Sequence, residues 1–148
     1  MTRTPVGEIW FTDGRLNATS EITVTTQPSL SQVYIHLVLD AEGRGLSGAG
    51  DCDVSIDKAG LSKLLSALKK ATQIARTEKM EWQMAGKIQY SWCDRDDFKD
   101  TSGRFLVDGR HGCVRLTVRL DPRNELEDYV ATLDLKAAEE LVSLLRTV

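Results

Sequence analysis

Two stretches of this 148-residue sequence decide its fold: Val33-Tyr-Ile-His-Leu-Val-Leu-Asp40 and Val114-Arg-Leu-Thr-Val-Arg-Leu-Asp121. Each places apolar residues at every second position and closes on Asp, which is the pattern of a half-buried β-strand. The second stretch begins 81 positions after the first. The chain therefore reads as one pattern written twice, and an internal repeat of this kind predicts the architecture better than the chemistry.

Other parts of the sequence repeat at similar offsets. Ser55-Ile-Asp57 returns 77 positions later as Thr132-Leu-Asp134, and Gly7-Glu-Ile9 has an echo in Gly86-Lys-Ile88. Apolar residues at helical spacing follow each Asp: Leu61, Leu64, Leu65 and Leu68 in the first half, and Ala138, Leu141, Val142 and Leu145 in the second. The spacing predicts two amphipathic helices, each capped by the preceding Asp.

The alternating runs predict four strands before each helix. They are expected over residues 8–12, 21–26, 32–40 and 52–56, and over 87–92, 104–107, 113–120 and 128–133, with residues 80–84 extending the fifth strand or forming one more. Short connections favour antiparallel sheets. We predict one α+β domain over residues 1–148, made of two ββββα repeats (about 7–76 and 86–148). Their antiparallel sheets would pack against the two helices with pseudo-two-fold symmetry.

Composition indicates a soluble globular protein, with 41% hydrophobic and 28% charged residues. No apolar run approaches the roughly 20 residues that a membrane-spanning helix needs. The first residues lack the apolar core of a signal peptide. The three cysteines, Cys52, Cys93 and Cys113, form no disulfide or metal pattern. We therefore expect a cytoplasmic protein with reduced thiols.

The net charge of −3 is unevenly distributed along the chain. Residues 1–76 carry eight acidic and eight basic side chains, whereas residues 77–148 carry 14 acidic and 11 basic ones. Two clusters hold much of the excess: Asp94, Asp96, Asp97 and Asp100, and then Asp121, Glu125, Glu127 and Asp128. Such clusters are either solvated loops or a patch that attracts a cationic partner.

Three motif-like features do not support a cofactor, a metal or catalysis. The G-x-G-x-x-G string at residues 43–48 precedes a predicted strand rather than the helix that would receive a pyrophosphate, so it indicates a hairpin loop. The segment 94–100 has Phe98 and Lys99 where a calcium loop needs an oxygen ligand and Gly. His36 and His111 lack metal-ligand spacing, and no acid–base pair is recognisable. We therefore expect a protein that is not an enzyme and has no cofactor.

The sheet faces away from the helices carry aromatic and basic residues. The prediction places Trp10, Tyr34 and His36 on one such face, and Lys87, Arg115 and Arg119 on another. Rings that stack on bases and cations that meet phosphates are what a single-stranded nucleic acid platform needs. The alternative is that these residues simply suit a half-exposed pleated surface.

Tandem ββββα units that end in an Asp-capped, leucine-striped helix resemble the Whirly and PUR folds of single-stranded nucleic acid binders. The second half also resembles bacterial immunity proteins encoded beside polymorphic or contact-dependent toxins. That similarity rests on Trp82, on the run Gly109-Arg-His-Gly-Cys-Val-Arg-Leu-Thr-Val-Arg-Leu120 and on Ala137-Ala-Glu-Glu-Leu-Val-Ser-Leu-Leu145. The first resemblance implies nucleic-acid binding, and the second implies inhibition of a toxin domain.

Two function hypotheses follow. The first is a non-enzymatic protein-binding inhibitor, of the immunity type, that captures a cationic toxin domain. Its expected binding residues are Trp92, Asp94, Asp96, Asp97, Phe98 and Asp100. The alternative is a single-stranded nucleic acid binder. The acidic balance, and the lack of a counterpart to the Lys-Gly-Lys type motif of Whirly proteins, favour the first.

Overall fold

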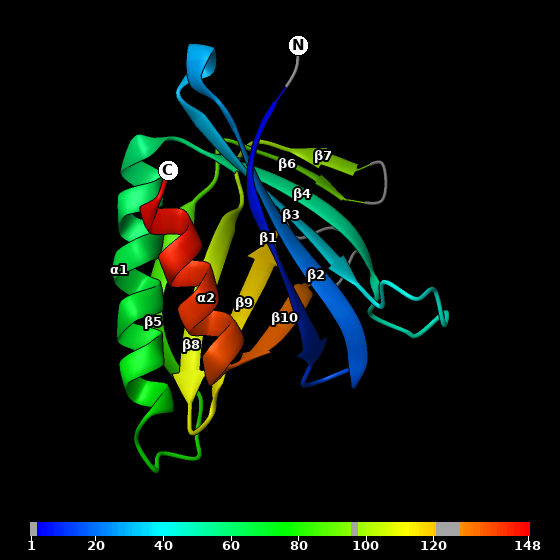
Figure 1. Cartoon of the computed structure of the whole chain (residues 1–148), viewed down its shortest axis with the longest axis vertical. Coiled ribbons are helices and arrows are strands. Elements are labelled where there is room, and N and C mark those ends of the chain that lie inside the picture. The colour runs from blue at the N-terminus through cyan, green and yellow to red at the C-terminus, as the bar shows by residue number, and fades with distance from the viewer. Residues whose placement is uncertain (1–2, 96–97, 121–127) are drawn as a thin grey trace.

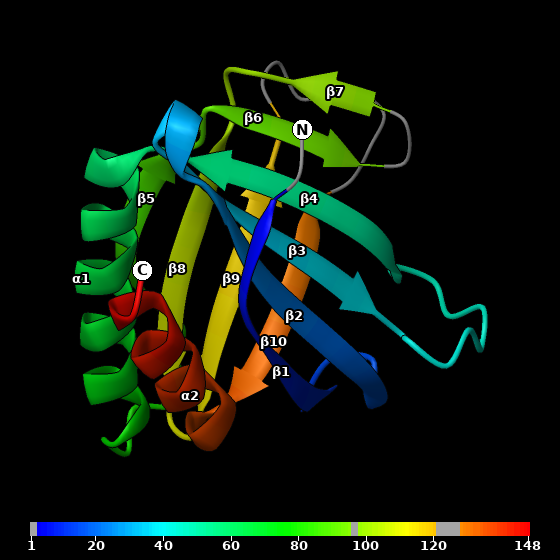
Figure 2. The same cartoon turned by 45° about the horizontal axis from the view of Figure 1, so that its top comes forward.

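The chain folds into two antiparallel sheets and two helices, as the computed structural model shows for residues 3–95, 98–120 and 128–148 (Figure 1). This arrangement confirms the predicted α+β class. Within the described residues, no helix combines the length and the apolar character that a membrane span requires. The two helices lie together on one side of the molecule, and the strands fill the other side (Figures 1 and 2).

The larger sheet has six strands in the order β1-β2-β3-β4-β6-β7. They are β1 (Thr4–Asp13), β2 (Ala18–Gln27), β3 (Gln32–Leu39), β4 (Gly50–Ile56), β6 (Trp92–Arg95) and β7 (Phe98–Asp100). Alternation in the sequence determines which side chains face the core. In β3, Ile35 and Leu37 are buried, whereas Tyr34 and His36 lie half-buried on the opposite face. The predicted strand over residues 32–40 and its two faces are confirmed.

The smaller sheet has four strands in the order β10-β9-β8-β5. They are β5 (Gln83–Gln89), β8 (Arg104–Arg110), β9 (Cys113–Arg119) and β10 (Tyr129–Asp134). Phe105, Val107 and Val118 are fully buried on its inner face. The turn between β8 and β9 contains Gly112 at φ 74°, a backbone conformation that favours glycine, as the predicted hairpin requires.

Each helix begins where the sequence predicts. In α1 (Lys58–Ala75), the carboxylate of Asp57 accepts a hydrogen bond from the Gly60 N–H at 2.7 Å. In α2 (Leu135–Arg146), the carboxylate of Asp134 accepts one from the Ala137 N–H at 2.7 Å. Each cap satisfies a backbone donor that has no partner within the helix. The two helices contact each other; α1 packs on β5, β8 and β9, and α2 packs on β1 and β10.

The predicted helix stripe forms part of the core. Leu64, Leu68, Leu141 and Leu145 are fully buried and belong to one cluster with apolar residues from both sheets. The expectation for Leu65 was too strong, because this side chain is half-buried at the margin of the cluster. One contiguous core unites the helices and the sheets, which fits a single packed domain.

Two contacts join the sheets to each other. The buried carboxylate of Asp13, at the end of β1, accepts the backbone N–H of Thr132 in β10 at 2.7 Å. The next residue, Gly14, donates its N–H to the Thr132 carbonyl at 3.0 Å. From the smaller sheet, the Tyr129 hydroxyl lies 2.6 Å from the Gly50 carbonyl and accepts the Leu39 N–H at 3.1 Å. The sheets are thus bonded together through backbone groups.

The strand predicted over residues 87–92 is wrong at its end. Strand β5 stops at Gln89, and the chain then crosses to the larger sheet, where Trp92 begins β6. The crossing is fixed by Tyr90, whose ring is buried, and by Ser91, whose N–H donates to the Ser55 carbonyl at 2.8 Å. As expected, residues before Lys87 extend the start of this strand.

The acidic segment over residues 94–100 was predicted as a loop, and this prediction is wrong where the structure describes it. Strands β6 and β7 form a hairpin that extends the larger sheet beside β4. The side chains alternate, but the inward positions hold Arg95 and Asp100 as well as Cys93. Because charged residues occupy inward positions, the apolar alternation that identifies a strand is missing from the sequence.

Two glycines that echo each other in the sequence lie where a helix packs closely on a strand. A Cβ atom at Gly7 would lie 2.6 Å from the Leu144 Cδ1, and one at Gly86 would lie 2.6 Å from the Ala67 Cβ. Each glycine directly follows a shift in strand register, at the start of β1 and of β5 respectively. The echo between Gly7-Glu-Ile9 and Gly86-Lys-Ile88 in the sequence thus has the same structural reason in both places.

The buried helix leucines should dominate stability. We expect Leu145→Ala to lower the free energy of unfolding by about 2–5 kcal/mol, because it leaves a cavity in the core. Leu65→Ala should lower it less, since Leu65 is half-buried, and Leu30→Ala should leave it nearly unchanged because Leu30 is 51% exposed. Urea unfolding of the three variants measures this order. Equal values for Leu145→Ala and Leu30→Ala would contradict the helix-face assignment.

Candidate functional site

Carboxylates and aromatic rings gather on the outer face of the six-stranded sheet. We call this surface the acidic face and define it by the outward-pointing side chains Glu8, Trp10, Glu21, Tyr34, His36, Asp51, Asp53, Trp92 and Asp94. Its five carboxylates come from β1, β2, β4 and β6. Strand pairing therefore assembles an acidic surface from residues as far apart in sequence as Glu8 and Asp94.

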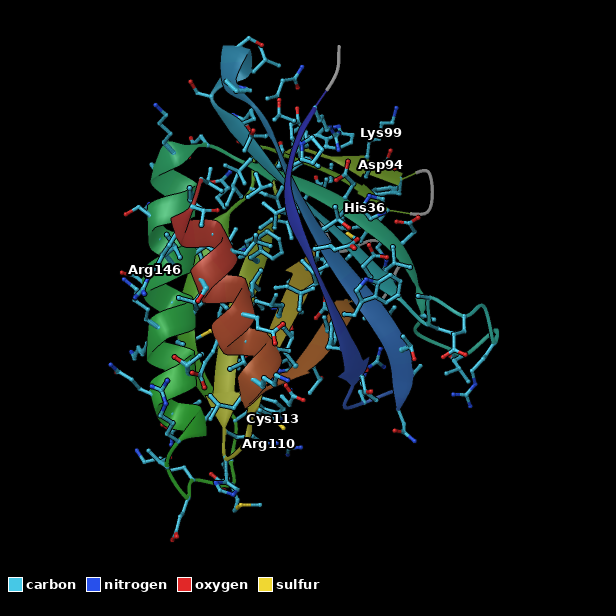
Figure 3. All side chains as sticks on the ribbon, viewed as in Figure 1. His36, Asp94, Lys99, Arg110, Cys113 and Arg146 are labelled. Carbon is cyan, nitrogen blue, oxygen red and sulfur yellow. The ribbon has the colours of Figure 1, made fainter. Side chains whose placement is uncertain are left out.

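Strand register places two carboxylates side by side on the acidic face. Asp53 in β4 lies directly opposite Asp94 in β6, and on its other side it lies opposite His36 in β3. Like charges directly opposite each other in an antiparallel pair destabilise the sheet. Lys99 lies opposite Asp94 on the far side, in β7. Figure 3 labels His36, Asp94 and Lys99, which come from β3, β6 and β7 respectively.

One side chain partly compensates the charge of Asp53. Arg3 donates to the Asp53 Oδ2 at 2.7 Å, and its guanidinium carbon lies 3.6 Å from the centre of the Tyr34 ring. The other carboxylate oxygen, Oδ1, is buried and has no hydrogen-bond partner among the described residues. An unsatisfied buried acceptor costs about 1–3 kcal/mol. Asp53 is therefore only partly compensated within the described residues.

The predicted partner-binding residues divide between the two faces of the sheet. Trp92 and Asp94 lie half-buried on the outer face, as that hypothesis requires. Phe98 pairs with the inward Arg95 and packs against the core, so it does not join Trp92 on the surface. The remaining two acids, Asp96 and Asp97, lie outside the described residues.

Asp100 has a structural role in this fold. Its carboxylate accepts hydrogen bonds from the Tyr90 hydroxyl and, at 2.9 Å, from the Gly103 N–H. Burial and the bond with Asp100 raise the pKa of the Tyr90 phenol well above its usual value. The inward position of Asp100 explains why it does not contribute to the acidic face.

The residues predicted as a nucleic-acid face are not brought together. Trp10, Tyr34 and His36 lie on the larger sheet, whereas the three cations lie on the outer face of the smaller one. Both arginines are paired: Arg115 with Asp108 at 3.4 Å and Arg119 with Asp128 at 2.8 Å. Lys87 is exposed on β5.

Sequence analysis missed the role of Trp82 on the smaller sheet. The guanidinium of Arg110 lies 4.5 Å from the centre of its ring, and that of Arg115 lies 4.2 Å from it. Both distances suit cation–π contacts. The ring that could have stacked on a base is therefore already covered by cations of the same chain. Trp10, by contrast, is 54% exposed on the acidic face.

Two cysteines that sequence spacing left unconnected lie together in the core. Cys52 in β4 and Cys93 in β6 are both buried, with 3.7 Å between their Sγ atoms. The contact with Cys93 and burial raise the pKa of the Cys52 thiol, which disfavours the nucleophilic thiolate. Among the described residues, no three His, Cys, Asp or Glu side chains are grouped as metal ligands would be.

Comparison with known proteins leaves the family of this chain open. No protein-family model matches it, and neither a curated protein nor a solved structure matches it significantly. The resemblance to Whirly folds and to immunity proteins therefore stays a prediction that rests on the residues quoted for it. Function has to be argued from the surfaces of the fold itself.

The buried tyrosines should make the protein sensitive to high pH. Burial is the leading cause that raises the pKa of both Tyr90 and Tyr129, and it raises the pKa of Tyr90 further. Because the folded-state pKa of each phenol lies above the unfolded value of about 10, deprotonation favours the unfolded chain. Their contribution to stability should be intact below about pH 10 and should fall as the pH rises further.

Absorbance at 295 nm measures this prediction directly. In the folded protein, Tyr90 and Tyr129 should remain un-ionised at about pH 10.5 and should ionise only when the chain unfolds. The Tyr129→Phe variant serves as the control because it removes one of these phenols while keeping a ring in place. Ionisation of all three tyrosines near pH 10 without unfolding would contradict the prediction.

Proposed function

We propose that this chain is a non-enzymatic protein-binding inhibitor, of the immunity type, that uses the acidic face to capture a basic toxin domain. The observation that carries the proposal is the pair Asp53 and Asp94, placed side by side on the outer face of the sheet. A lysine or arginine from a partner that reaches Asp94 would relieve the repulsion.

The composition of the acidic face suits this role. Five carboxylates outnumber the nearby cations Arg3 and Lys99, with Asp51 in contact with the His36 ring. Trp10 offers an exposed ring among these carboxylates. Complementary charge speeds encounter between proteins, with association rates raised by about 10–10³-fold. Exposed tryptophans frequently supply the anchor of an interface. Carboxylates that steer association and an aromatic side chain that can anchor a partner are therefore combined on one face of the sheet.

The alternative of single-stranded nucleic acid binding has weaker support. A phosphate backbone would be repelled by the carboxylates of the face that carries Trp10 and Tyr34. On the other sheet, Arg115 and Arg119 already have carboxylate partners, and Trp82 is covered. We retain this alternative as an outcome of the experiment below.

We also propose that the fold consists of two ββββα units related by pseudo-two-fold symmetry, as in Whirly and PUR proteins. The equivalent strands would be β3 and β9, which contain Val33–Leu39 and Val114–Arg119 respectively. The β6–β7 hairpin would then be an insertion in the second unit, between β5 and β8. Superposition of residues 7–76 on 86–148 with that hairpin omitted tests this equivalence.

Charge reversal on the acidic face should slow association without unfolding the protein. The test variant is Glu21→Lys with Asp94→Lys, and the matched control is Glu78→Lys with Glu81→Lys, which changes the net charge equally on an exposed loop. Affinity capture from the native host identifies the partner, and stopped-flow mixing of purified proteins then measures rates. The test variant should associate at least about tenfold more slowly, whereas the control should change little.

Two results would contradict the proposed function. One is an equal loss of association rate in both variants, because net charge alone would then explain binding. The other is micromolar or tighter binding to single-stranded oligonucleotides that Arg115→Glu with Arg119→Glu abolishes and that charge reversal at Glu21 and Asp94 leaves intact. Urea unfolding of each variant confirms that its fold is retained.

A further inference from the structure

An open groove runs between strand β1 and helix α2. It has a volume of about 880 Å³, and β1 contributes Glu8 and Ile9 to its walls. The helix contributes a set of apolar and acidic side chains: Leu135, Glu139, Glu140 and Leu144, together with Lys136 as the one basic lining residue in the described part of the chain. The groove thus combines apolar contacts with three carboxylates, of which Glu139 is already paired with Arg76 at 3.4 Å.

The strand that forms one wall of this groove is an open sheet edge. Of the described residues, β1 pairs along its length with β2 alone, and its contact with β10 comes at the far end, around Asp13. Backbone N–H and C=O groups on its other side are therefore available for pairing. An exposed edge beside a helix is the arrangement that accepts an added peptide strand.

A second groove is built in the same way between β5 and α1. Its volume is about 470 Å³, and it too lies at a sheet edge where a helix packs over a glycine, here Gly86. Its charged lining residues are Lys63, Lys70 and Lys87. The two grooves therefore share a construction and differ in the sign of their charge.

The two grooves carry opposite charges at positions that correspond to each other in the sequence repeat. In the echo between Gly7-Glu-Ile9 and Gly86-Lys-Ile88, Glu8 occupies the position of Lys87. At the helix offset of 77 residues, Glu140 occupies the position of Lys63. Both reversals fall on residues that line the grooves. Close packing against a helix explains why glycine occurs at both positions. It does not explain the opposite charges at two equivalent exposed positions.

We propose that the β1–α2 groove binds an extended cationic segment of a partner protein, with Lys or Arg alternating with apolar residues, as a strand added to the edge of β1. Alternation places the cationic side chains on one face of that strand, where they would meet Glu8, and the apolar side chains on the other face, toward α2. Glu140, on the α2 wall of the groove, would add to the attraction. Apolar side chains would contact Ile9 and Leu144. The carboxylates repel a phosphate backbone, so the occupant is a peptide.

A second copy of the chain fits this groove less well than a peptide does. The complementary edge of another copy would be β5, but α1 packs directly on that strand at Gly86. A strand that arrives with its own helix would meet α2, since helix axes need about 8–10 Å between them. A single extended segment avoids that collision.

The inference rests on the proposed function only for the sign of the partner's charge. The groove lies at the opposite edge of the larger sheet from the β6–β7 hairpin, so the two surfaces can be tested separately.

The probe is a fluorescein-labelled ten-residue peptide in which Lys alternates with Val or Thr. Fluorescence anisotropy with the full chain measures its dissociation constant. A peptide with Glu in place of Lys, and a Lys peptide with N-methyl groups on alternate amides, are the ligand controls.

The test variant is Glu8→Lys with Glu140→Lys, both exposed. It should weaken binding of the Lys peptide at least about tenfold, whereas Glu78→Lys with Glu81→Lys, which changes the net charge equally on an exposed loop, should change it little. N-methylation should abolish binding, because it removes the donors that strand addition needs. Hydrogen exchange should slow along Thr4–Asp13 when the peptide is bound.

Each other outcome overturns the inference. Absence of binding at millimolar peptide, equal binding of the N-methylated peptide, or indifference to the test variant would each do so. The result is separable from the proposed function, because Glu21→Lys with Asp94→Lys should leave peptide binding intact while it slows capture of the whole partner. Peptide binding in the groove without any effect of the acidic-face variant on partner capture would refute the proposed function alone.

Discussion

The buried carboxylate of Asp13 holds the two sheets in their relative positions. One oxygen accepts the Thr132 N–H from the edge of the smaller sheet, and the other accepts the N–H groups of Arg15 and Leu16 in the turn after β1. Hydrogen bonds to a charged group contribute about 1.5–3 kcal/mol each. Because Asp13 is fully buried, removing these donors would leave an unpaired charge inside the protein. The hydrogen bonds of Asp13 therefore fix the position at which β1 ends against β10.

Both candidate surfaces depend on that junction. With its end fixed against β10, the rest of β1 lies beside α2 and keeps its other edge unpaired among the described residues, which creates the groove. The same strand places Trp10 on the outer face of the sheet, in register with Glu21. The larger sheet can carry a polar outer face because its inner face is fully covered by the helices and the smaller sheet.

The sequence was sufficient to predict the strands and helices whose apolar residues recur at one regular spacing. Strand β3 and both capped helices were predicted, because alternation or helical spacing is unbroken there. The β6–β7 hairpin was missed because its inward positions include Arg95 and Asp100, whose partners cannot be read from the chain. The contact between Cys52 and Cys93 was missed for the same reason: it depends on β6 joining β4 across 41 residues of sequence.

Charge counted along the chain does not reveal which sheet carries an acidic surface. The second half holds the excess of acid, yet on the smaller sheet, which that half forms, Asp108 and Asp128 are paired with Arg115 and Arg119. The β6 strand instead carries Asp94 across to the larger sheet, next to Asp53 from the first half. On the smaller sheet these carboxylates are compensated by arginines. On the larger sheet carboxylates from both halves of the chain accumulate, and they produce a negative local field that neither half would produce alone. The sign of each surface is therefore a property of strand pairing, since pairing decides which charges meet a partner inside the chain and which remain to meet one outside it.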